Sequence, residues 1–214
     1  MREQFRKELD RLDQDLVRMA GLVEDAIENA LLALSECDLE RAERVKQGDD
    51  AIDDMFLDIE QRALSLLAQQ QPVAGDLRLI MAIVLNLNDL ERSGDLAYNV
   101  ADLVQKDLPI VRHKTVNALI YELGTSAKNL LGRSLDAWSA KDVKLAAEID
   151  ELDDAVDDLY EQLLKELFEL EGVTLELALN LVLVGRYFER IADHAVNIAE
   201  RIQYYVTGDL AHLG

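Results

Sequence analysis

Residues 91–102 of the chain read ERSGDLAYNVAD, and residues 189–200 read ERIADHAVNIAE. Both copies contain Glu-Arg-x-x-Asp-x-Ala-x-Asn-x-Ala followed by a carboxylate, and they begin 98 positions apart, at Glu91 and Glu189. An α-helix turns by about 100° per residue, so Asp95, Asn99 and Asp102 fall at about 40°, 80° and 20° from Glu91. The motif therefore places its acidic and amide side chains on one narrow helical stripe.

The stripe overlaps the arc that the helix is expected to bury. On the same scale Val84 lies at about 20°, Tyr98 at about −20° and Leu87 at about −40° from Glu91. A buried carboxylate must be paired with a cation, protonated or bound to a metal. The pattern thus requires something that neutralises these acids.

A second pair of similar segments shows that the whole chain is duplicated. Residues 49–56 (DDAIDDMF) align with residues 153–160 (DDAVDDLY), 104 positions later. Breaks, acidic clusters and motifs follow the same order in both halves, which indicates a tandem repeat of one structural unit. We expect one unit over residues 1–108 and a second over residues 109–214, with a hinge at Pro109.

Each unit carries three amphipathic segments of helical period. The apolar positions predict helices at about 4–35, 39–70, 74–107, 112–139, from the break at 140–142 to about 171, and 174–206. Asp38 is a plausible N-cap, and Gly172 and Gly208 are expected to stop helices five and six. The fold class is therefore all-α, with six long helices forming a tandem duplication of an antiparallel three-helix bundle.

The composition narrows the class of partner. With 22 basic and 43 acidic residues the net charge is −21, which disfavours nucleic-acid binding and favours cations or basic partner surfaces. One cysteine excludes internal disulfides and cysteine-based zinc sites. No signal-peptide core or bilayer-spanning apolar run is present, so we expect a soluble, cytoplasmic protein.

The acidic stripe has counterparts on the neighbouring helix of each unit. Four Asp/Glu-x-x-x-Asp pairs result: Asp49 with Asp53, Glu91 with Asp95, Asp153 with Asp157, and Glu189 with Asp193. Converging carboxylates repel unless cations lie among them, and carboxylates readily bridge metals, so these pairs predict a multinuclear metal site in each unit. Asn99, Asp102, Asn197 and Glu200 continue the stripe, either as further ligands or as groups that hydrogen-bond the ligands. His194 points about 100° away from Asp193 and is expected to be partly exposed rather than a ligand.

Enzyme chemistry is not indicated by the motifs. The sequence contains no Glu-x-x-His, glycine-rich phosphate loop, nucleophile elbow or His-Glu-x-x-His. Two alternatives to a metal-binding adaptor stay open. One is a carboxylate-bridged metalloenzyme of the helical-bundle type, and the other is a metal-free helical adaptor whose acidic stripes meet basic partners.

Several motifs together resemble those of the PhoU family, accessory regulators of the high-affinity phosphate transporter. They are Gly48-Asp49 with Asp53, Pro72-x-x-x-Asp76-Leu77-Arg78, the two Glu-Arg-x-x-Asp motifs, and Tyr204-Tyr205-Val206-Thr207-Gly208. The family's usual Glu-Arg-Ile-Gly-Asp has Ser93 in the first copy and Ala192 in the second. The second half also lacks a Pro-x-x-x-Asp-Leu-Arg segment.

The resemblance implies a function that the residues alone do not. Family members are non-enzymatic negative regulators that repress the phosphate-starvation response, contacting the transporter's ATPase and a membrane sensor histidine kinase. They bind iron or zinc clusters through their Glu/Asp-x-x-x-Asp pairs and commonly form homodimers. For this chain it therefore implies metal clusters on the eight paired carboxylates and the same two partners.

Overall fold

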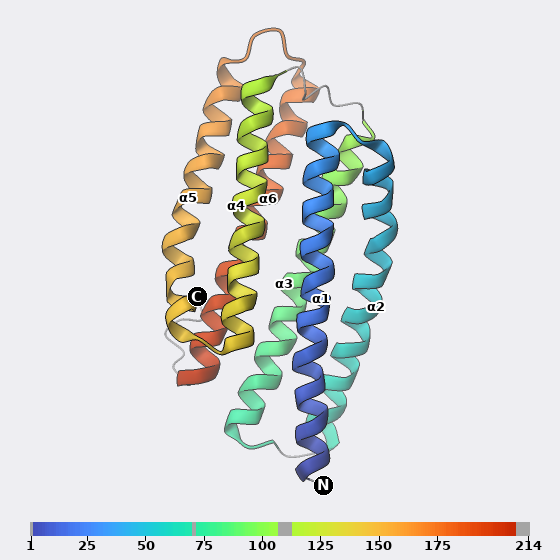
Figure 1. Cartoon of the computed structure of the whole chain (residues 1–214), viewed down its shortest axis with the longest axis vertical. Helices are drawn as coiled ribbons and strands as arrows, with labels where there is room; N and C mark the ends of the chain where they lie inside the picture. The colour runs from blue at the N-terminus through green and yellow to red at the C-terminus, as the bar shows by residue number, and fades with distance from the viewer. Residues whose placement is uncertain (1, 70–71, 107–112, 209–214) are drawn as a thin grey trace.

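Six α-helices make up the part of the chain that the computed structural model describes, residues 2–69, 72–106 and 113–208 (Figure 1). In order they are α1 (Arg2–Glu36), α2 (Leu39–Gln69), α3 (Ala74–Val104), α4 (Lys114–Ala140), α5 (Val143–Glu169) and α6 (Leu175–Thr207). These described ranges contain no strand. The predicted all-α class is confirmed, as expected for a sequence rich in strong helix formers with two prolines.

The repeat is visible in the backbone of the first turn of each unit. Cys37 and Lys141, 104 positions apart, both adopt a left-handed conformation, with φ of 55° and 53°. The next residue, Asp38 or Asp142, accepts backbone hydrogen bonds at the start of the following helix. The predicted cap at Asp38 is confirmed, and the same turn is built twice.

Helix ends follow the prediction closely except for two helices, of which α3 ends at Val104 rather than near residue 107. α5 ends at Glu169 rather than near Glu171, because Leu170 is already extended, with φ −76° and ψ 114°. Gly172 takes the left-handed conformation within the turn that follows, and Gly208 takes it directly at the end of α6. The predicted boundary at 108/109 and its hinge Pro109 lie outside the described residues.

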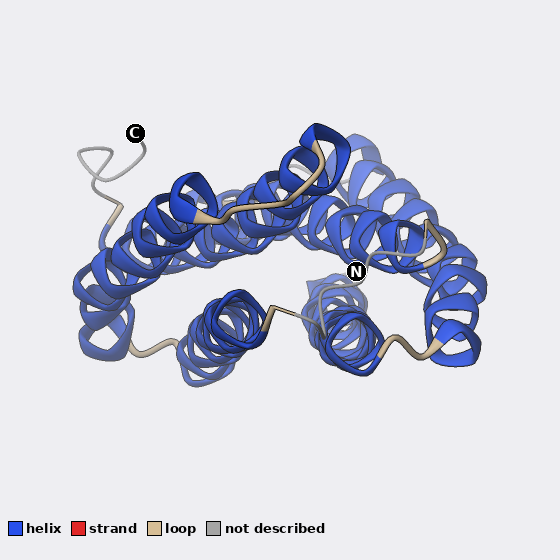
Figure 2. Ribbon diagram, turned by 90° about the horizontal axis from the view of Figure 1, so that it is seen from above, coloured by secondary structure: helices blue, strands red, loops and turns tan. Residues whose placement is uncertain are grey.

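The six helices form two bundles that pack side by side. α1, α2 and α3 contact one another, and so do α4, α5 and α6; the two bundles meet where α3 packs on α6 and α1 on α4. α1 and α4 thus form one layer, and α2, α3, α6 and α5 form a second, curved layer over it (Figure 2). The predicted pair of three-helix bundles is confirmed.

The apolar core extends through both bundles. Trp138 and Phe188 are completely buried, together with leucine and isoleucine side chains from all six helices. Each such side chain stabilises the fold by about 1.5–3 kcal/mol. Gly124 on α4 allows a close approach at the centre, because a Cβ there would lie 2.7 Å from Leu31 of α1 and 3.0 Å from Phe188. The core is therefore continuous between the bundles.

Among the described residues, no helix is both long enough and apolar enough to cross a membrane.

Candidate functional site

Four carboxylates of the first bundle come together between α2 and α3. Asp49 and Asp53 lie on α2, and Glu91 and Asp95 lie on α3. Loss of hydration is the main reason that the pKa of Asp49 rises to about 6, and the charges of Asp53 and Asp95 add to it. The pKa of Glu91 is also raised, mainly by burial and to a smaller extent by repulsion from Asp95 and Asp53. The two predicted pairs of this bundle therefore face each other.

The second bundle repeats the cluster between α5 and α6. Asp153 and Asp157 lie on α5, and Glu189 and Asp193 lie on α6. Burial raises the pKa of Asp153 to about 7, with further contributions from the charges of Asp157, Asp193 and Glu189. The structure thus places the eight predicted carboxylates in two groups of four, within which their charges act on one another.

Close helix contact narrows the groove at each cluster. A Cβ on Gly94 of α3 would lie 3.2 Å from Ile52 and 3.6 Å from the Oδ1 of Asp49, both on α2. A Cβ on Gly185 of α6 would lie 2.6 Å from Leu163 and 3.0 Å from Tyr160, both on α5. Glycine at these two positions lets the carboxylate-bearing helices approach each other.

The acidic stripe is less buried than its helical phase predicts. Asp53, Asp95 and Asp157 are exposed, whereas Asp49, Glu91, Asp153 and Asp193 are half-buried and Glu189 is buried. The reason is that α1 and α4 cover only one side of the four-helix layer. Both clusters therefore open on the opposite side of that layer, in the grooves α2–α3 and α5–α6.

One arginine that the sequence reasoning missed enters the second cluster. Arg186, one turn before Glu189, forms an ion pair with its Oε1. The other oxygen of Glu189, Oε2, is buried and has no hydrogen-bond partner. The sequence contained a signal for this ion pair, since Arg186 and Glu189 are three residues apart and therefore lie on the same face of α6. Glu189 therefore carries one neutralised oxygen and one buried oxygen that still lacks a donor.

The donor set fits a hard or borderline cation. It consists of carboxylate oxygens, one of them buried without a donor, and desolvation raises the pKa of six of the eight carboxylates. Within residues 2–69, 72–106 and 113–208, no three Asp, Glu, His or Cys side chains already lie close enough to hold an ion. Like charges repel, so metal binding requires these side chains to rotate inward.

The residues that continue the stripe have other surroundings. Asp102 accepts a hydrogen bond of 2.7 Å from Lys46 and lies 3.4 Å from Lys106, and the Lys46 bond holds the pKa of Asp102 low. Asn99 is exposed, and Asn197 and Glu200 are half-buried. Asp102 is thus engaged by lysines, about two helical turns beyond Asp95.

The expectation that His194 is partly exposed is wrong. His194 is buried, with 5% of its surface exposed, because its face of α6 packs against α3 of the other bundle. Its Nδ1 lies 2.9 Å from the Oγ of Ser93, and burial lowers the pKa of His194 to about 4. Ser93 already donates its hydroxyl proton to the carbonyl of Asp89, so the neutral ring donates from Nδ1 to Ser93.

His194 belongs to a buried polar group between the bundles, which we call the α3–α6 polar cluster: Asn86, Asp89 and Ser93 on α3 with His194 and Arg201 on α6. Arg201 pairs with Asp89 and donates a hydrogen bond of 3.1 Å to the Oδ1 of Asn86. The cluster lies on the faces of α3 and α6 away from the carboxylate grooves. The sequence analysis did not predict this cluster, because helical periodicity assigns only one buried arc to each helix.

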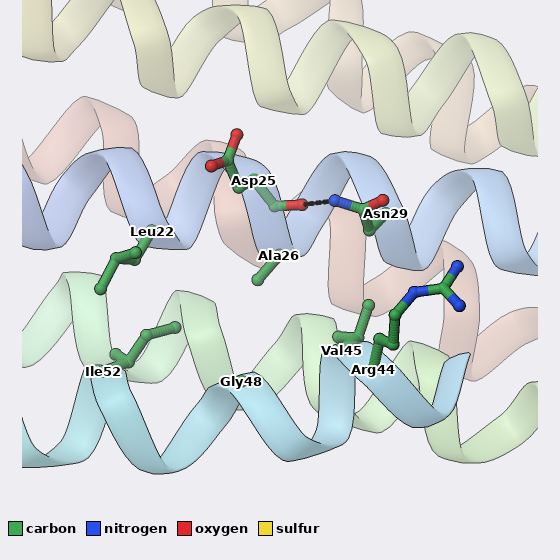
Figure 3. A pocket seen from close by; sticks show the side chains of 8 residues that line it. All are labelled: Leu22, Asp25, Ala26, Asn29, Arg44, Val45, Gly48 and Ile52. Atoms are coloured by element: carbon green, nitrogen blue, oxygen red, sulfur yellow. Dashed lines mark hydrogen bonds between the residues drawn. The ribbon is translucent and has the colours of Figure 1, made fainter. Parts of the chain in front are cut away.

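A cavity of about 270 Å³ lies elsewhere, in the groove between α1 and α2 (Figure 3). Its polar side chains are Asp25, Asn29 and Arg44, and Gly48 leaves room on the α2 side. Asn29 donates to the carbonyl of Asp25 and accepts from Arg41. This cavity contains none of the predicted ligands.

Comparison with known proteins matches both bundles to one family. The model of the PhoU domain matches residues 16–104 and 120–202. The chain is 37% identical to the phosphate-specific transport system accessory protein PhoU homolog of Synechocystis sp., over 97% of this chain and 93% of the relative. The homolog of Aquifex aeolicus is 39% identical over 86% of this chain and 84% of the relative.

Solved structures give the same result. The crystal structure of PhoU from Pseudomonas aeruginosa has a TM-score of 0.85 and 34% identity, covering 96% of this chain and 100% of that one. The phosphate transport system regulatory protein PhoU from Streptococcus pneumoniae has a TM-score of 0.85 and 28% identity, covering 97% and 99%. The fold, the paired helical units and the full-length similarity agree, and the chain belongs to the PhoU family.

Proposed function

We propose that this chain is a non-enzymatic negative regulator of phosphate uptake and of the phosphate-starvation response. It acts as a metal-binding adaptor between the ATPase of the phosphate transporter and a sensor histidine kinase, and it works as a homodimer. Family membership supports a role as an accessory protein of phosphate transport, since the relatives carry that name. The observation that carries the metal-binding part is the convergence of four carboxylates in each bundle.

The carboxylate clusters are costly without a counter-ion. Burial, with added repulsion from neighbouring carboxylates, raises the pKa of Asp49 to about 6 and that of Asp153 to about 7, so ionisation near neutral pH costs free energy. The resemblance drawn from the sequence motifs implies iron or zinc, and all-oxygen donor sets with bridging carboxylates suit multinuclear sites. We therefore assign a multinuclear iron or zinc cluster to each groove, held by Asp49, Asp53, Glu91 and Asp95 and by Asp153, Asp157, Glu189 and Asp193.

Metal bound by these carboxylates would have a structural effect, because each cluster joins two helices. Asp49 and Asp53 with Glu91 and Asp95, and their counterparts on α5 and α6, would hold a cation whose positive charge would tie α2 to α3 and α5 to α6. The buried Oε2 of Glu189, which lacks a hydrogen-bond partner, would be available to such a cation, while Arg186 neutralises the other oxygen. Since both grooves open on one side of the four-helix layer, metal binding fixes the shape and charge of that surface. This is the surface that we assign to the partner proteins.

Metal content tests the assignment with a matched pair of variants. The test variant carries Asp49→Asn, Asp53→Asn, Asp153→Asn and Asp157→Asn. The control carries Asp50→Asn, Asp54→Asn, Asp154→Asn and Asp158→Asn, which removes the same charge from exposed positions of the same two helices. We expect elemental analysis of protein purified without chelator to find bound metal in the wild type and control and almost none in the test variant.

The same variants test the regulatory role in cells. A phosphate-starvation reporter in a host lacking its own copy of this regulator is expected to stay repressed at high phosphate with the control and to be induced with the test variant. Equal metal content in the two variants would contradict the ligand assignment. Full repression by a test variant shown to be metal-free would contradict the link between metal and signalling.

A further inference from the structure

The cavity between α1 and α2, which we call the α1–α2 cavity, is bordered mainly by aliphatic side chains. Leu22 and Ala26 come from α1, and Val45 and Ile52 come from α2. Figure 3 shows Leu22 and Ile52 both reaching into the gap between the two helices. The volume of about 270 Å³ is below the usual range of ligand pockets, so the cavity has the scale of a side chain rather than of a cofactor.

Gly48 of α2 also lines this cavity, and the chain itself does not require glycine there. A Cβ on Gly48 would meet nothing within 4 Å. The residue lies inside the helix Leu39–Gln69, where glycine is less favourable than alanine. The missing side chain therefore weakens the helix and keeps the α1–α2 cavity open.

The repeat identifies the equivalent place in the second bundle. The offset of 104 that relates α2 to α5 also relates α1 to α4, because the buried Leu31 and Leu34 recur as the buried Leu135 and Trp138. The α1–α2 cavity therefore corresponds to the contact between α4 and α5.

Larger aliphatic side chains occupy that equivalent place. Leu130 stands where the first bundle has Ala26, and Leu152 stands where it has Gly48. Leu130 is buried, and Leu152 is 38% exposed, so most of its surface is covered. The second bundle thus covers with its own leucines the place that the first bundle leaves open.

The rim of the cavity also differs from its counterpart. In the second bundle Arg133 of α4 donates a hydrogen bond of 3.1 Å to Glu148 of α5, which makes an ion pair across the two helices. The corresponding residues of the first bundle are Asn29, which is uncharged, and Arg44. Within the part of the chain that the structure describes, Arg44 is exposed, forms no ion pair and acts on Asp38 only at a distance. Its guanidinium group can therefore receive a carboxylate from outside the chain.

We propose that the α1–α2 cavity receives a leucine side chain of a partner protein, with an adjacent carboxylate of that partner paired to Arg44. The second bundle supplies both features internally, as Leu152 and as the Arg133–Glu148 pair. Because the net charge of −21 opposes an acidic segment at long range, a single carboxylate beside the leucine fits better than an acidic run. None of the predicted metal ligands lines the cavity, so this site stands apart from metal binding.

Binding can be followed by NMR on the isotopically labelled full chain, with chelator present. The probe is the peptide acetyl-Ala-Ala-Leu, whose free C-terminal carboxylate lies next to the leucine side chain. We expect dose-dependent shifts at the amide of Gly48 and at the methyl groups of Val45 and Ile52. Acetyl-Ala-Ala-Gly should cause none of these shifts, and the C-terminal amide of the leucine peptide should bind more weakly. Equal shifts with the leucine and glycine peptides, or none with either, would overturn the proposal.

Three variants make the test specific. Gly48→Leu copies the second bundle, so an internal leucine fills the cavity, and binding should weaken at least tenfold without a lower thermal midpoint. Gly75→Leu places the same side chain at another helical glycine whose Cβ would meet nothing within 4 Å, and it should leave binding unchanged. Arg44→Gln should weaken binding of the leucine peptide by about two- to fivefold, the range of an exposed ion pair, and leave binding of its amide unchanged.

The outcomes separate a built site from general contact with apolar peptides. Loss of binding with Gly48→Leu and its retention with Gly75→Leu support the proposal. Equal binding by Gly48→Leu and the wild type would overturn the leucine site, and equal effects of Arg44→Gln on the acid and the amide would overturn the carboxylate pairing. If dilution of the chain alone produces the same shifts, the occupant is a second copy of this chain, and the proposal of a different partner fails.

Discussion

Asp89→Ala is expected to destabilise the chain by about 3–5 kcal/mol, because it leaves Arg201 as a buried charge without its partner. The side chains of Asp89 and Arg201 are only 5% and 14% exposed, and they join the two bundles. After the substitution, Arg201 keeps the amide oxygen of Asn86 but no carboxylate. Urea unfolding of the variant and the wild type at pH 7 measures the difference.

A second variant distinguishes the lost charge pairing from the lost volume. The double replacement Asp89→Leu with Arg201→Met removes both charges and keeps apolar volume at the contact between α3 and α6. We expect it to recover most of the stability, since an apolar pair of similar size often equals a buried ion pair. If Asp89→Ala costs less than about 1 kcal/mol, the ion pair does not contribute as its burial indicates.

Asp153→Asn is expected to stabilise the metal-free chain at pH 8, the opposite of what most substitutions do. Its pKa is about 7 in the folded protein against an ordinary value of 3.8, so the folded state binds the proton more tightly than the unfolded state. Stability from this group is therefore present at low pH and lost as pH rises through about 7. Asparagine removes the ionisation, and after solvent screening of a half-exposed group we expect a gain of about 1–2 kcal/mol.

The pH window is chosen so that His194 does not interfere. Its pKa is lowered to about 4 from 6.5, so the stability it contributes is present above pH 6.5 and is lost as pH falls toward 4. Between pH 6.5 and 8 the carboxylates dominate, and the metal-free wild type should lose stability as pH rises while Asp153→Asn does so much less. Thermal unfolding with chelator at both pH values measures this, with Asp154→Asn as the control. Equal behaviour of the two variants would contradict the prediction.

Added metal should reverse the order of stability. An ion that binds only the folded state stabilises it by an amount that grows with its concentration relative to Kd. The wild type, which keeps Asp153, is expected to gain more than Asp153→Asn. The residues that weaken the metal-free fold are then the ones through which metal strengthens it, a common feature of functional sites.

Helical phase within one helix was predictable from the sequence. The spacing of Glu91, Asp95 and their counterparts placed the acids on one stripe, and the repeat offsets placed the facing pairs on the neighbouring helix. Both inferences depend only on helix geometry and on the duplication, which survive any tertiary arrangement. This is why the eight carboxylates lie along two grooves, four in each, while their role as metal ligands stays a prediction.

The environment of each face was harder to predict, because it depends on which helices cover it. The angle between Asp193 and His194 was correctly derived, but only the docking of one bundle on the other shows that the His194 face is buried. The same docking leaves the side of Asp53, Asp95 and Asp157 open. The duplication in the sequence predicts two bundles. It does not predict that they contact each other through α3 and α6, because that contact depends on packing between units far apart in the chain.

The shared orientation of the two grooves also affects binding strength. Under the proposed function, a partner broad enough to span α2, α3, α6 and α5, which form one curved layer in Figure 2, would contact both clusters in one encounter. The second contact then forms at a high effective concentration, and overall avidity exceeds that of either contact alone. Occupancy of both proposed metal sites would thus act multiplicatively on partner affinity, and such a bivalent surface would respond to metal supply more steeply than a single site.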